Sequence, residues 1–332
     1  MKHFTTVHDL QDPIQLVNDA IELKSNPYAF QNRGKNKTIG LIFLNASLRT
    51  RLSMQKAARM LGMEVMVMNM DKEAWAIEWN DDTVMNGTTV EHIKDAAAVL
   101  GSYCDIIGIR CFPGLTDRKK DYSEHLLLQL MKYCHVPVIS LESATLHPLQ
   151  SLADAITIKE NWQEKHKPKV VLTWAPHIKP LPQAVANSFS EWMTKMEVEF
   201  TITQPKGYEL CEDFTRGAQI TYNQMEAMTN ADFVYVKNWS SYNDYGQMPE
   251  VKENWMMDLS KHKLTNNAHI MHCLPVRRDL ELSSLLIDHP KSLVQQQAAN
   301  RVYSSLVVIK SILEKLNKNN DSFIKKEELT YI

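Results

Sequence analysis

The sequence predicts an α/β fold with two doubly wound parallel-sheet domains, and three observations support this prediction. Short, continuously apolar runs such as 38–44 and 169–174 alternate with helical patterns. Strands that are apolar throughout are typical of parallel sheets covered by helices on both faces. The alternation occurs twice, and 332 residues suit two domains of roughly 150 residues each. An apolar fraction of 44% is sufficient for two packed cores.

In the first half of the chain, apolar residues recur with helical spacing between the apolar runs. Helices are expected at 14–25, 49–62, 91–103 and 122–134. Strands are expected at 38–44, 65–69, 105–110 and 137–141. These elements predict a first domain over residues 1–145.

A helix expected at 150–165 links the first half to a second set of elements. Strands are predicted at 169–174, 197–203, 232–236, 269–272 and 292–295, and helices at 183–195 and 223–229. They define a second domain over residues 150–296. A long helix at 297–316 follows and can pack back on the first domain. Residues 317–332 are polar and charged, and we expect a frayed tail there.

Charge and cysteine content exclude several classes of protein. The net charge is −2, so nothing indicates binding to nucleic acid or to an anionic membrane. The five cysteines form no C-x-x-C pair, which indicates neither a disulfide framework nor a thiolate zinc site. The N-terminus lacks the apolar core of a signal peptide, and no apolar run is long enough to span a bilayer. We expect a cytoplasmic protein.

A candidate phosphate site lies at Ser47-Leu48-Arg49-Thr50-Arg51, directly after the strand predicted at 38–44. The free N–H groups and the dipole of a helix N-terminus favour an anion, and arginine adds a planar fork of donors. An ordinary helix start with Ser47 as N-cap would show the same spacing. Nucleotide-binding glycine loops are absent from this glycine-poor sequence, so side chains and a helix end must build any phosphate site.

Further polar residues follow the ends of the other predicted strands. Ligands of open α/β sheets bind beyond the carboxyl ends of the strands, so these residues are expected to face one site. Each of them alone has an ordinary structural explanation: His147 as a helix cap, or Cys273 in the core. Together they mark one candidate site: Arg110, Glu142, His147, Gln150, Lys237, Cys273, Arg277 and Arg301.

Three of these segments occur in an order that resembles the aspartate/ornithine carbamoyltransferase family. They are Ser47-Leu48-Arg49-Thr50-Arg51, His147-Pro148-Leu149-Gln150 and His272-Cys273-Leu274-Pro275. The resemblance covers residues 2 to 316. The Ser-Met-Gly loop of ordinary ornithine carbamoyltransferases is missing, and Lys237-Asn238-Trp239 stands in that region. Together with Trp75 and a proline-rich stretch at 174–183, this resembles the N-acylornithine branch, most closely its N-succinylornithine enzymes.

The resemblance implies transfer of the carbamoyl group of carbamoyl phosphate to the δ-amine of an N-acylornithine in arginine biosynthesis, with no metal or cofactor. It implies that residues 1–145 bind carbamoyl phosphate and residues 150–296 bind the acylornithine. It also implies a knotted C-terminal domain and a homotrimer in which Trp75 completes the neighbouring site. The carbamoyl phosphate residues so implied are Ser47, Leu48, Arg49, Thr50, Trp75, Arg110, His147, Gln150, Cys273, Leu274 and Arg301, with Arg110, His147, Gln150, Cys273 and Arg301 acting on the carbamoyl group.

For the acceptor, the resemblance implies contacts from Glu142, His177, Lys237, Leu274 and Arg277. Val90 stands where acetylornithine enzymes carry Glu and succinylornithine enzymes carry Pro. Because valine does not repel the second carboxylate of a succinyl group, succinylornithine is favoured over acetylornithine. Glu281 lies near the position of a modified lysine in acetylornithine enzymes. A catalytically silent homologue that binds these ligands as a signal is the alternative from a different class.

Overall fold

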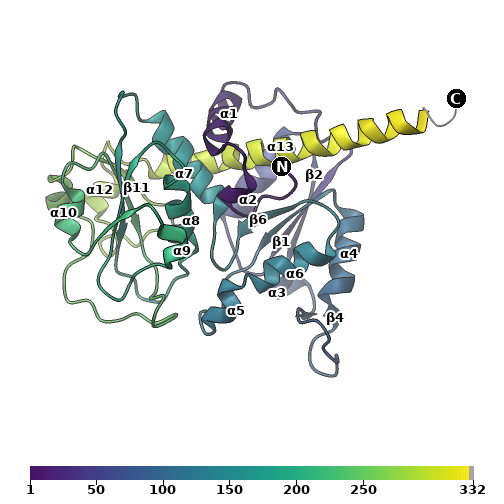
Figure 1. Cartoon of the computed structure of the whole chain (residues 1–332), viewed down its shortest axis with the longest axis horizontal. Coiled ribbons are helices and arrows are strands. Elements are labelled where there is room, and N and C mark those ends of the chain that lie inside the picture. Colours follow the sequence, from purple (N-terminus) through teal and green to yellow (C-terminus); the bar gives the residue numbers. More distant parts are fainter. Residues whose placement is uncertain (329–332) are drawn as a thin grey trace.

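The computed structural model describes residues 1–328, with side chains for residues 1–317 other than Asp71. Two parallel sheets lie side by side, each with helices on its faces (Figure 1). The first is a four-stranded sheet of order β2-β1-β5-β6, and the second is a five-stranded sheet of order β11-β10-β7-β8-β9. Every strand pair in these two sheets is parallel. The predicted fold class is therefore confirmed.

The first sheet lies among the N-terminal helices. Its strands are β1 (Thr38–Phe43), β2 (Glu64–Asn69), β5 (Ile106–Arg110) and β6 (Val138–Glu142). The other elements of this half are η1 (Val7–Asp9), α1 (Pro13–Ser25), α2 (Arg49–Met60), α3 (Met70–Glu73), α4 (Ile93–Tyr103), α5 (Arg118–Tyr122) and α6 (His125–Tyr133). A separate pair of short strands, β3 (Ile77–Glu78) and β4 (Glu91–His92), carries a loop that projects away from the body (Figure 1).

The second sheet follows the linking helix α7 (Pro148–Glu160). Its strands are β7 (Lys169–Trp174), β8 (Glu199–Thr203), β9 (Gln219–Thr221), β10 (Phe233–Lys237) and β11 (His269–Met271). The remaining helices are α8 (Ala184–Met193), α9 (Glu212–Thr215), α10 (Gln224–Met228), α11 (Leu259–His262), α12 (Ser284–Ile287) and α13 (Val294–Glu328).

Helix α13 joins the two halves, because it starts beside the second sheet and runs across to the first (Figure 1). It packs against α2, α7 and α1. Leu306, Ile309 and Leu313 on its inner side are completely buried in one apolar core that both sheets share. This packing fixes the position of α2 relative to α7, and both of these helices begin at the candidate site.

Two sequence predictions at the C-terminal end are wrong. Residues 292–295 do not form a strand: Ser292 makes one isolated bridge to Ile270, and α13 begins at Val294. The short apolar run passes directly into helix-forming Gln and Ala residues, so it is absorbed into the helix. The final helix was expected over 297–316 with a frayed tail, but it continues to Glu328, since no Gly or Pro stops it. Residues 329–332 of that tail lie outside the described residues.

The helix expected at 122–134 is interrupted. Glu124 has a left-handed backbone conformation, with φ of 53°, and separates α5 from α6. Its carboxylate accepts hydrogen bonds from Ser143 and Thr145 in the loop after β6. The break therefore holds the loop that leads to His147.

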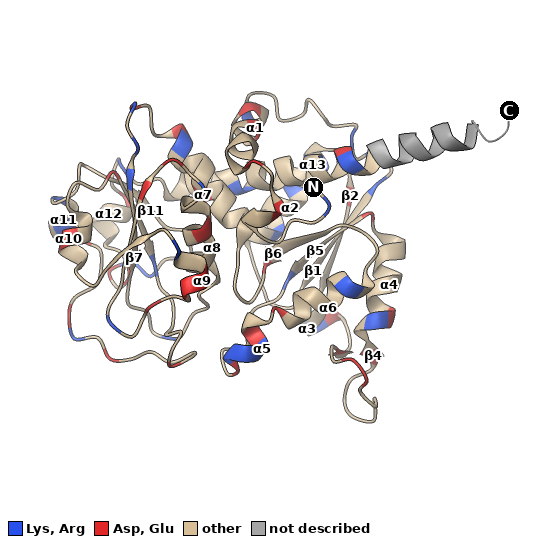
Figure 2. Cartoon of the chain, viewed as in Figure 1, with Lys and Arg blue, Asp and Glu red and all other residues tan. Residues whose placement is uncertain are grey.

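The charged residues are distributed over both halves of the described chain, with Lys and Arg interspersed among Asp and Glu (Figure 2). Among the described residues, no helix combines the length and the apolar character needed to cross a bilayer.

Candidate active site

The carboxyl ends of β1, β5, β6, β7, β10 and β11 lead into segments that line one cavity of about 680 Å³. Both sheets and helices α2, α7 and α13 contribute to it. Its walls are Ala46, Ser47, Leu48, Arg49, Thr50, Arg110, Phe112, Glu142, His147, Gln150, His177, Lys179, Leu181, Pro182, Val185, Lys237, Cys273, Leu274, Pro275, Val276, Arg277, Glu281 and Arg301. Two smaller hollows, each lined in part by His166 and Lys167, lie near the start of β7, away from these strand ends.

The start of α2 forms one wall of the cavity. The helix begins at Arg49 without a side-chain hydrogen bond at its cap position, Leu48. Ser47 Oγ accepts a bond from Thr50 N at 3.3 Å, so the ordinary capping role of Ser47 is present as well. The other first-turn N–H groups have no intrahelical partner, and with the Arg49 side chain they suit a dianion.

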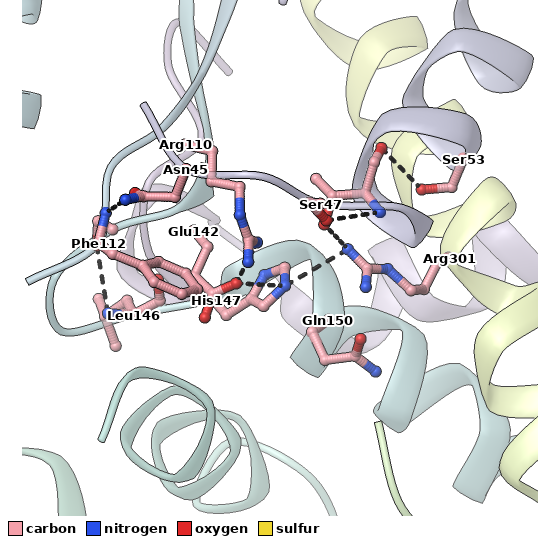
Figure 3. A network of polar contacts seen from close by, with 12 residues as sticks. Asn45, Ser47, Ser53, Arg110, Phe112, Glu142, Leu146, His147, Gln150 and Arg301 are labelled. Atoms are coloured by element: carbon pink, nitrogen blue, oxygen red, sulfur yellow. Dashed lines mark hydrogen bonds and ion pairs between the residues drawn. The ribbon is translucent and has the colours of Figure 1, made fainter. Parts of the chain in front are cut away.

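The second wall is a charge network around Glu142 (Figure 3). An Arg110 guanidinium nitrogen donates to Glu142 Oε2, which also lies 3.3 Å from His147 Nε2. The guanidinium of Arg110 sits 4.3 Å from the centroid of the Phe112 ring. All three charged or polar side chains are buried, so their mutual contacts, rather than water, fix their positions.

Arg301 brings α13 into this network. Its guanidinium donates to Thr50 Oγ1 at 2.5 Å and approaches His147 Nε2 at 3.4 Å (Figure 3). Burial lowers the pKa of Arg301 to about 10, which leaves it charged at neutral pH. Burial, with the positive charges of Arg301 and Arg110, holds the pKa of His147 well below its usual value. His147 is therefore a neutral imidazole beside two cations.

The segment after β11 forms the third wall. His272 Nδ1 accepts a bond from Leu274 N at 2.9 Å, so its proton lies on Nε2 and faces Glu281 Oε2 at 3.0 Å. Burial lowers the pKa of His272, and the bond to Glu281 offsets this only in part. For Glu281, burial acts to raise the pKa, but the bond from His272 leaves it lowered overall. A charged carboxylate thus anchors the Cys273–Leu274 turn.

A basic group lies at the mouth of the cavity. Arg277 Nε donates to His177 Nε2 at 3.2 Å, and Arg277 N donates to Glu281 Oε1 at 3.3 Å. Lys237, at the end of β10, is buried and donates to Asn238 O at 2.9 Å. Side chains from β10, the loop after β7 and the loop after β11 therefore meet on the second-domain side.

The structure brings together the residues singled out from the sequence, except for Arg51, Trp75 and Val90. Arg51, in the predicted phosphate segment, does not line the cavity, and its Nη1 donates to Asn69 Oδ1 at 3.2 Å. Trp75 and Val90 lie outside the cavity: Trp75 shortly precedes β3, and Val90 is the last residue of the loop between β3 and β4. Trp75 is 57% exposed and donates from Nε1 to Glu91 at 2.7 Å, and Val90 is 64% exposed. Among the described residues, neither Trp75 nor Val90 is part of the cavity wall.

Several wall residues were not predicted from the sequence. Phe112 and Lys179 follow predicted site segments closely but carry no motif. Glu281, four residues after Arg277, was given no role in the sequence analysis, which noted only that it lies near the position of a modified lysine in acetylornithine enzymes. Asp154 and Gln297 lie behind the wall and touch Gln150 or the backbone of His272. Asp154 was detectable, because it follows Gln150 by one helical turn.

Two parallel-sheet domains with a basic anion site between them define a class of transferases. Two family models that match this chain identify the class. The carbamoyl-P binding domain of aspartate/ornithine carbamoyltransferase matches residues 2–160, and the Asp/Orn binding domain of that family matches residues 182–314. The chain belongs to the aspartate/ornithine carbamoyltransferase family.

Individual relatives match nearly the whole chain. N-succinylornithine carbamoyltransferase of Bacteroides thetaiotaomicron is 47% identical, with 95% of this chain and 100% of the relative covered. N-acetylornithine carbamoyltransferase of Xanthomonas campestris pv. campestris is 35% identical, with 94% and 98% covered. A solved variant of N-acetyl-L-ornithine transcarbamylase, in complex with carbamyl phosphate and N-succinyl-L-norvaline, has a TM-score of 0.88 and 35% identity, with 94% and 100% covered.

Proposed function

We propose that the protein is an N-succinylornithine carbamoyltransferase. It transfers the carbamoyl group of carbamoyl phosphate to the δ-amine of N-succinyl-L-ornithine, giving N-succinyl-L-citrulline and phosphate, as a cytoplasmic step of arginine biosynthesis. The observation that carries this proposal is the single cavity in which the α2 N-terminus, the Arg110–His147–Arg301 group and the basic mouth meet. The identity to enzymes of that name supports the same conclusion.

Carbamoyl phosphate fits the first-domain side of the cavity. The Leu48 backbone and the side chains of Ser47, Arg49 and Thr50 would hold the phosphate at the helix N-terminus. Arg110, His147 and Arg301 converge nearby and would surround the carbamoyl oxygen. Gln150 and the Cys273–Leu274 backbone would hold the carbamoyl amino group. Preorganised donors of this kind are each worth about 3–4 kcal/mol when aimed at a developing oxyanion.

The acceptor would enter from the basic mouth. His177, Lys237 and Arg277 would hold the carboxylates, and Glu142 and the Leu274 backbone would face the δ-amine end. The neutral amine attacks the carbonyl carbon, a tetrahedral oxyanion forms, and the bond from carbon to the phosphate oxygen breaks. The departing phosphate takes the proton that the amine loses.

The protonation state of the amine is set by the same charges. A primary alkyl amine has a pKa near 10 in water, so only about one molecule in a thousand is neutral at pH 7. The cations around the cavity disfavour the ammonium form and so increase the reactive fraction.

We also propose that the active unit is a homotrimer. Trp75, just before β3, and Val90, at the end of the loop between β3 and β4, are exposed and lie outside the cavity of their own chain, which supports a role in the site of a neighbouring subunit. There Trp75 would reach the phosphate, and Val90 would lie beside the acyl group. A dianionic succinyl group suits a His/Lys/Arg pocket next to an uncharged valine.

The test is to incubate the purified protein with carbamoyl phosphate and ornithine, N-acetylornithine or N-succinylornithine, and to measure ureido product. We expect the highest kcat/KM with N-succinylornithine. Val90→Glu should shift the kcat/KM ratio toward N-acetylornithine, since two like charges about 4 Å apart repel by roughly 1–4 kcal/mol. A wild-type preference for N-acetylornithine would make that acceptor, the second candidate, the substrate. Absence of ureido product with all three would indicate a silent homologue.

We further propose that the C-terminal domain is knotted, as the resemblance implies. The segment after β10 is bonded to the proline-rich loop after β7 along its length: Asn238 Nδ2 donates to Ala175 O at 2.6 Å, and Ser240 N donates to Leu181 O at 2.9 Å. Pulling the chain from its two ends should give a fully extended length shorter than that of an unknotted chain.

A further inference from the structure

Asp154 is a buried carboxylate behind the cavity wall that the proposed chemistry does not use. It lies on α7, one turn after Gln150, and is completely inaccessible to solvent. Its Oδ1 accepts two hydrogen bonds, from Gln150 Nε2 and from Gln297 Nε2, both at 2.7 Å. Burying a carboxyl group that forms no ion pair among the described residues costs free energy, and this cost points to a role for Asp154.

The two bonds decide how the amide of Gln150 is turned. A glutamine side chain can present either its oxygen or its NH₂ group to a given neighbour. Because Asp154 Oδ1 accepts, it selects the NH₂ group of Gln150. Gln150 Oε1 is then left buried with no hydrogen-bond partner among the described residues, in a side chain that lines the cavity. Figure 3 shows this oxygen on the side of Gln150 where Arg301 lies.

The same carboxylate also reaches the turn after β11. Gln297 uses its NH₂ group on Asp154, and its Oε1 accepts a bond from His272 N at 2.9 Å. Helix α7, helix α13 and the segment leading to Cys273 and Leu274 are therefore tied to one oxygen atom. Gln150, whose Oε1 is buried and unpaired among the described residues, belongs to the cavity wall on one side of this assembly, and the Cys273–Leu274 turn belongs to it on another.

We propose that Asp154 is a positioning residue that makes the cavity present an acceptor, Gln150 Oε1, to the amino group of the carbamoyl moiety. This inference rests on the proposed function, since it names the group that the acceptor recognises. Asp154 acts through Gln150 and does not touch the substrate. Burial raises the pKa of Asp154 to about 7. Protonation on Oδ2, which has no partner among the described residues, leaves Oδ1 an acceptor, so the device works in both forms.

The test compares two ligands of similar shape, phosphonoacetamide and phosphonoacetate, by calorimetric titration. Only the first carries an amide NH₂ group at the position of the carbamoyl amine. Asp154→Leu removes the acceptor and frees the Gln150 amide to turn. We expect the ratio of the affinity for phosphonoacetamide to that for phosphonoacetate to fall at least about tenfold. The reason is that a turned Gln150 would present its NH₂ group, a donor, to the NH₂ group of phosphonoacetamide, and a buried hydrogen bond would be lost.

Two variants serve as controls. Asp154→Asn removes the charge but keeps an oxygen that can accept both bonds, so it should retain the wild-type ratio. Thr157→Val breaks the bond from Asn300 Nδ2 to Thr157 Oγ1, another link between α7 and α13, and should also retain the ratio. An unchanged ratio in Asp154→Leu, or an equal fall in either control, overturns the proposal. If the wild-type protein binds neither ligand, the proposed function fails instead.

A second experiment keeps the proposal testable if Asp154→Leu does not fold. Gln150→Glu places a second carboxyl group beside that of Asp154, so neither can donate to the other when both are ionised, and kcat/KM for carbamoyl phosphate should fall. Adding Asp154→Asn restores a donor toward residue 150, with the same one carboxyl and one amide as the wild type. The double variant should recover at least about tenfold in kcat/KM, and no recovery overturns the proposal.

Discussion

The guanidinium groups of Arg49, Arg110 and Arg301 come from three elements that are distant in the sequence, yet all line one cavity. Three cations with one carboxylate, Glu142, repel one another until an anion enters. In the proposed reaction, a bound phosphate dianion would offset that repulsion, and the developing oxyanion would offset it further. The proposed function therefore implies an arrangement more complementary to the reacting complex than to the empty site.

At this scale the first prediction concerns Arg49. Arg49→Ala should lower kcat/KM for carbamoyl phosphate by about 10²-fold or more, because a positioned charge on the phosphate is lost. The free energy of unfolding should change by less than about 0.5 kcal/mol, since the side chain is not in the core. Steady-state kinetics and urea unfolding measure the two effects. Arg59→Ala, at the far end of the same helix, is the control and should keep the wild-type rate; near-normal activity of folded Arg49→Ala would remove this loop from the site.

The second prediction concerns pH. The pKa of His147 is lowered in the folded protein, whereas in the unfolded chain it is about 6.5. Below pH 6.5 the unfolded chain binds a proton that the folded protein does not bind. Stability from this group is complete above pH 6.5 and is lost as pH falls, with a slope of up to about 1.4 kcal/mol per pH unit.

Urea unfolding at fixed protein concentration between pH 5 and 7.5 measures this slope. His147→Gln should reduce the slope by up to one proton, and His166→Gln, at an exposed histidine, controls for the loss of an imidazole. Asp154 acts in the opposite direction, because its pKa is raised to about 7 in the folded protein and its contribution is lost as pH rises. Because the His147 variant and the wild type both retain Asp154, its contribution cancels when one slope is subtracted from the other. Equal slopes would show that His147 is not held neutral by the fold.

At the scale of the elements, the sequence predicted the sheet strands that are apolar throughout. β7 was predicted at its observed bounds, and β1 within one residue. It did not predict β3, β4 or β9, because these two- and three-residue strands carry polar residues and form no apolar run. It also did not predict the spatial order of the strands, which depends on contacts between residues far apart in the chain.

The candidate site followed the same logic. Motif residues at strand ends were predicted to gather, and the structure brings them into one cavity because parallel strands end at a common edge. The supporting residues Asp154, Gln297 and Glu281 were not assigned roles, since their bonds cross between α7, α13 and the turn after β11. Spacing along one helix reveals Asp154, but only the packing of α13 reveals Gln297.

Helix α13 provides the prediction for this scale. Leu313→Ala removes a completely buried side chain at the contact between the helix and the shared core, and should lower the free energy of unfolding by about 2–5 kcal/mol. The neighbouring Glu314→Gln breaks a part-exposed ion pair with Lys310 and should cost less than about 1 kcal/mol. Chemical unfolding of both variants at one protein concentration provides the comparison. Equal, small effects would mean that α13 is not held by the core.

At the scale of the whole molecule, Trp75 and Val90 lie outside the cavity of their own chain. They would take part in catalysis only in the proposed trimer, where they would complete the site of a neighbouring subunit. A site shared between subunits permits complementation. Mixed trimers of Arg49→Ala and Trp75→Ala contain interfaces where an intact Arg49 meets an intact Trp75, so activity should partly return after subunit exchange.

The matched control mixes Arg49→Ala with Arg301→Ala. Both residues line the cavity of one chain, so no mixed assembly restores a complete site, and activity should stay low. Recovery in the control, or a stable monomer with full activity, would contradict the shared site.

The central claim is that the cavity moves a carbamoyl group onto the δ-nitrogen of an acylated ornithine. Nuclear magnetic resonance tests it directly with ¹³C-labelled carbamoyl phosphate and N-succinylornithine labelled with ¹⁵N at the δ-amine. The proposed function predicts a ureido carbon signal split by one-bond coupling to ¹⁵N, growing at the rate at which phosphate is released. Release of phosphate with the label appearing only as bicarbonate or cyanate, and with no carbon–nitrogen coupling, would contradict the claim.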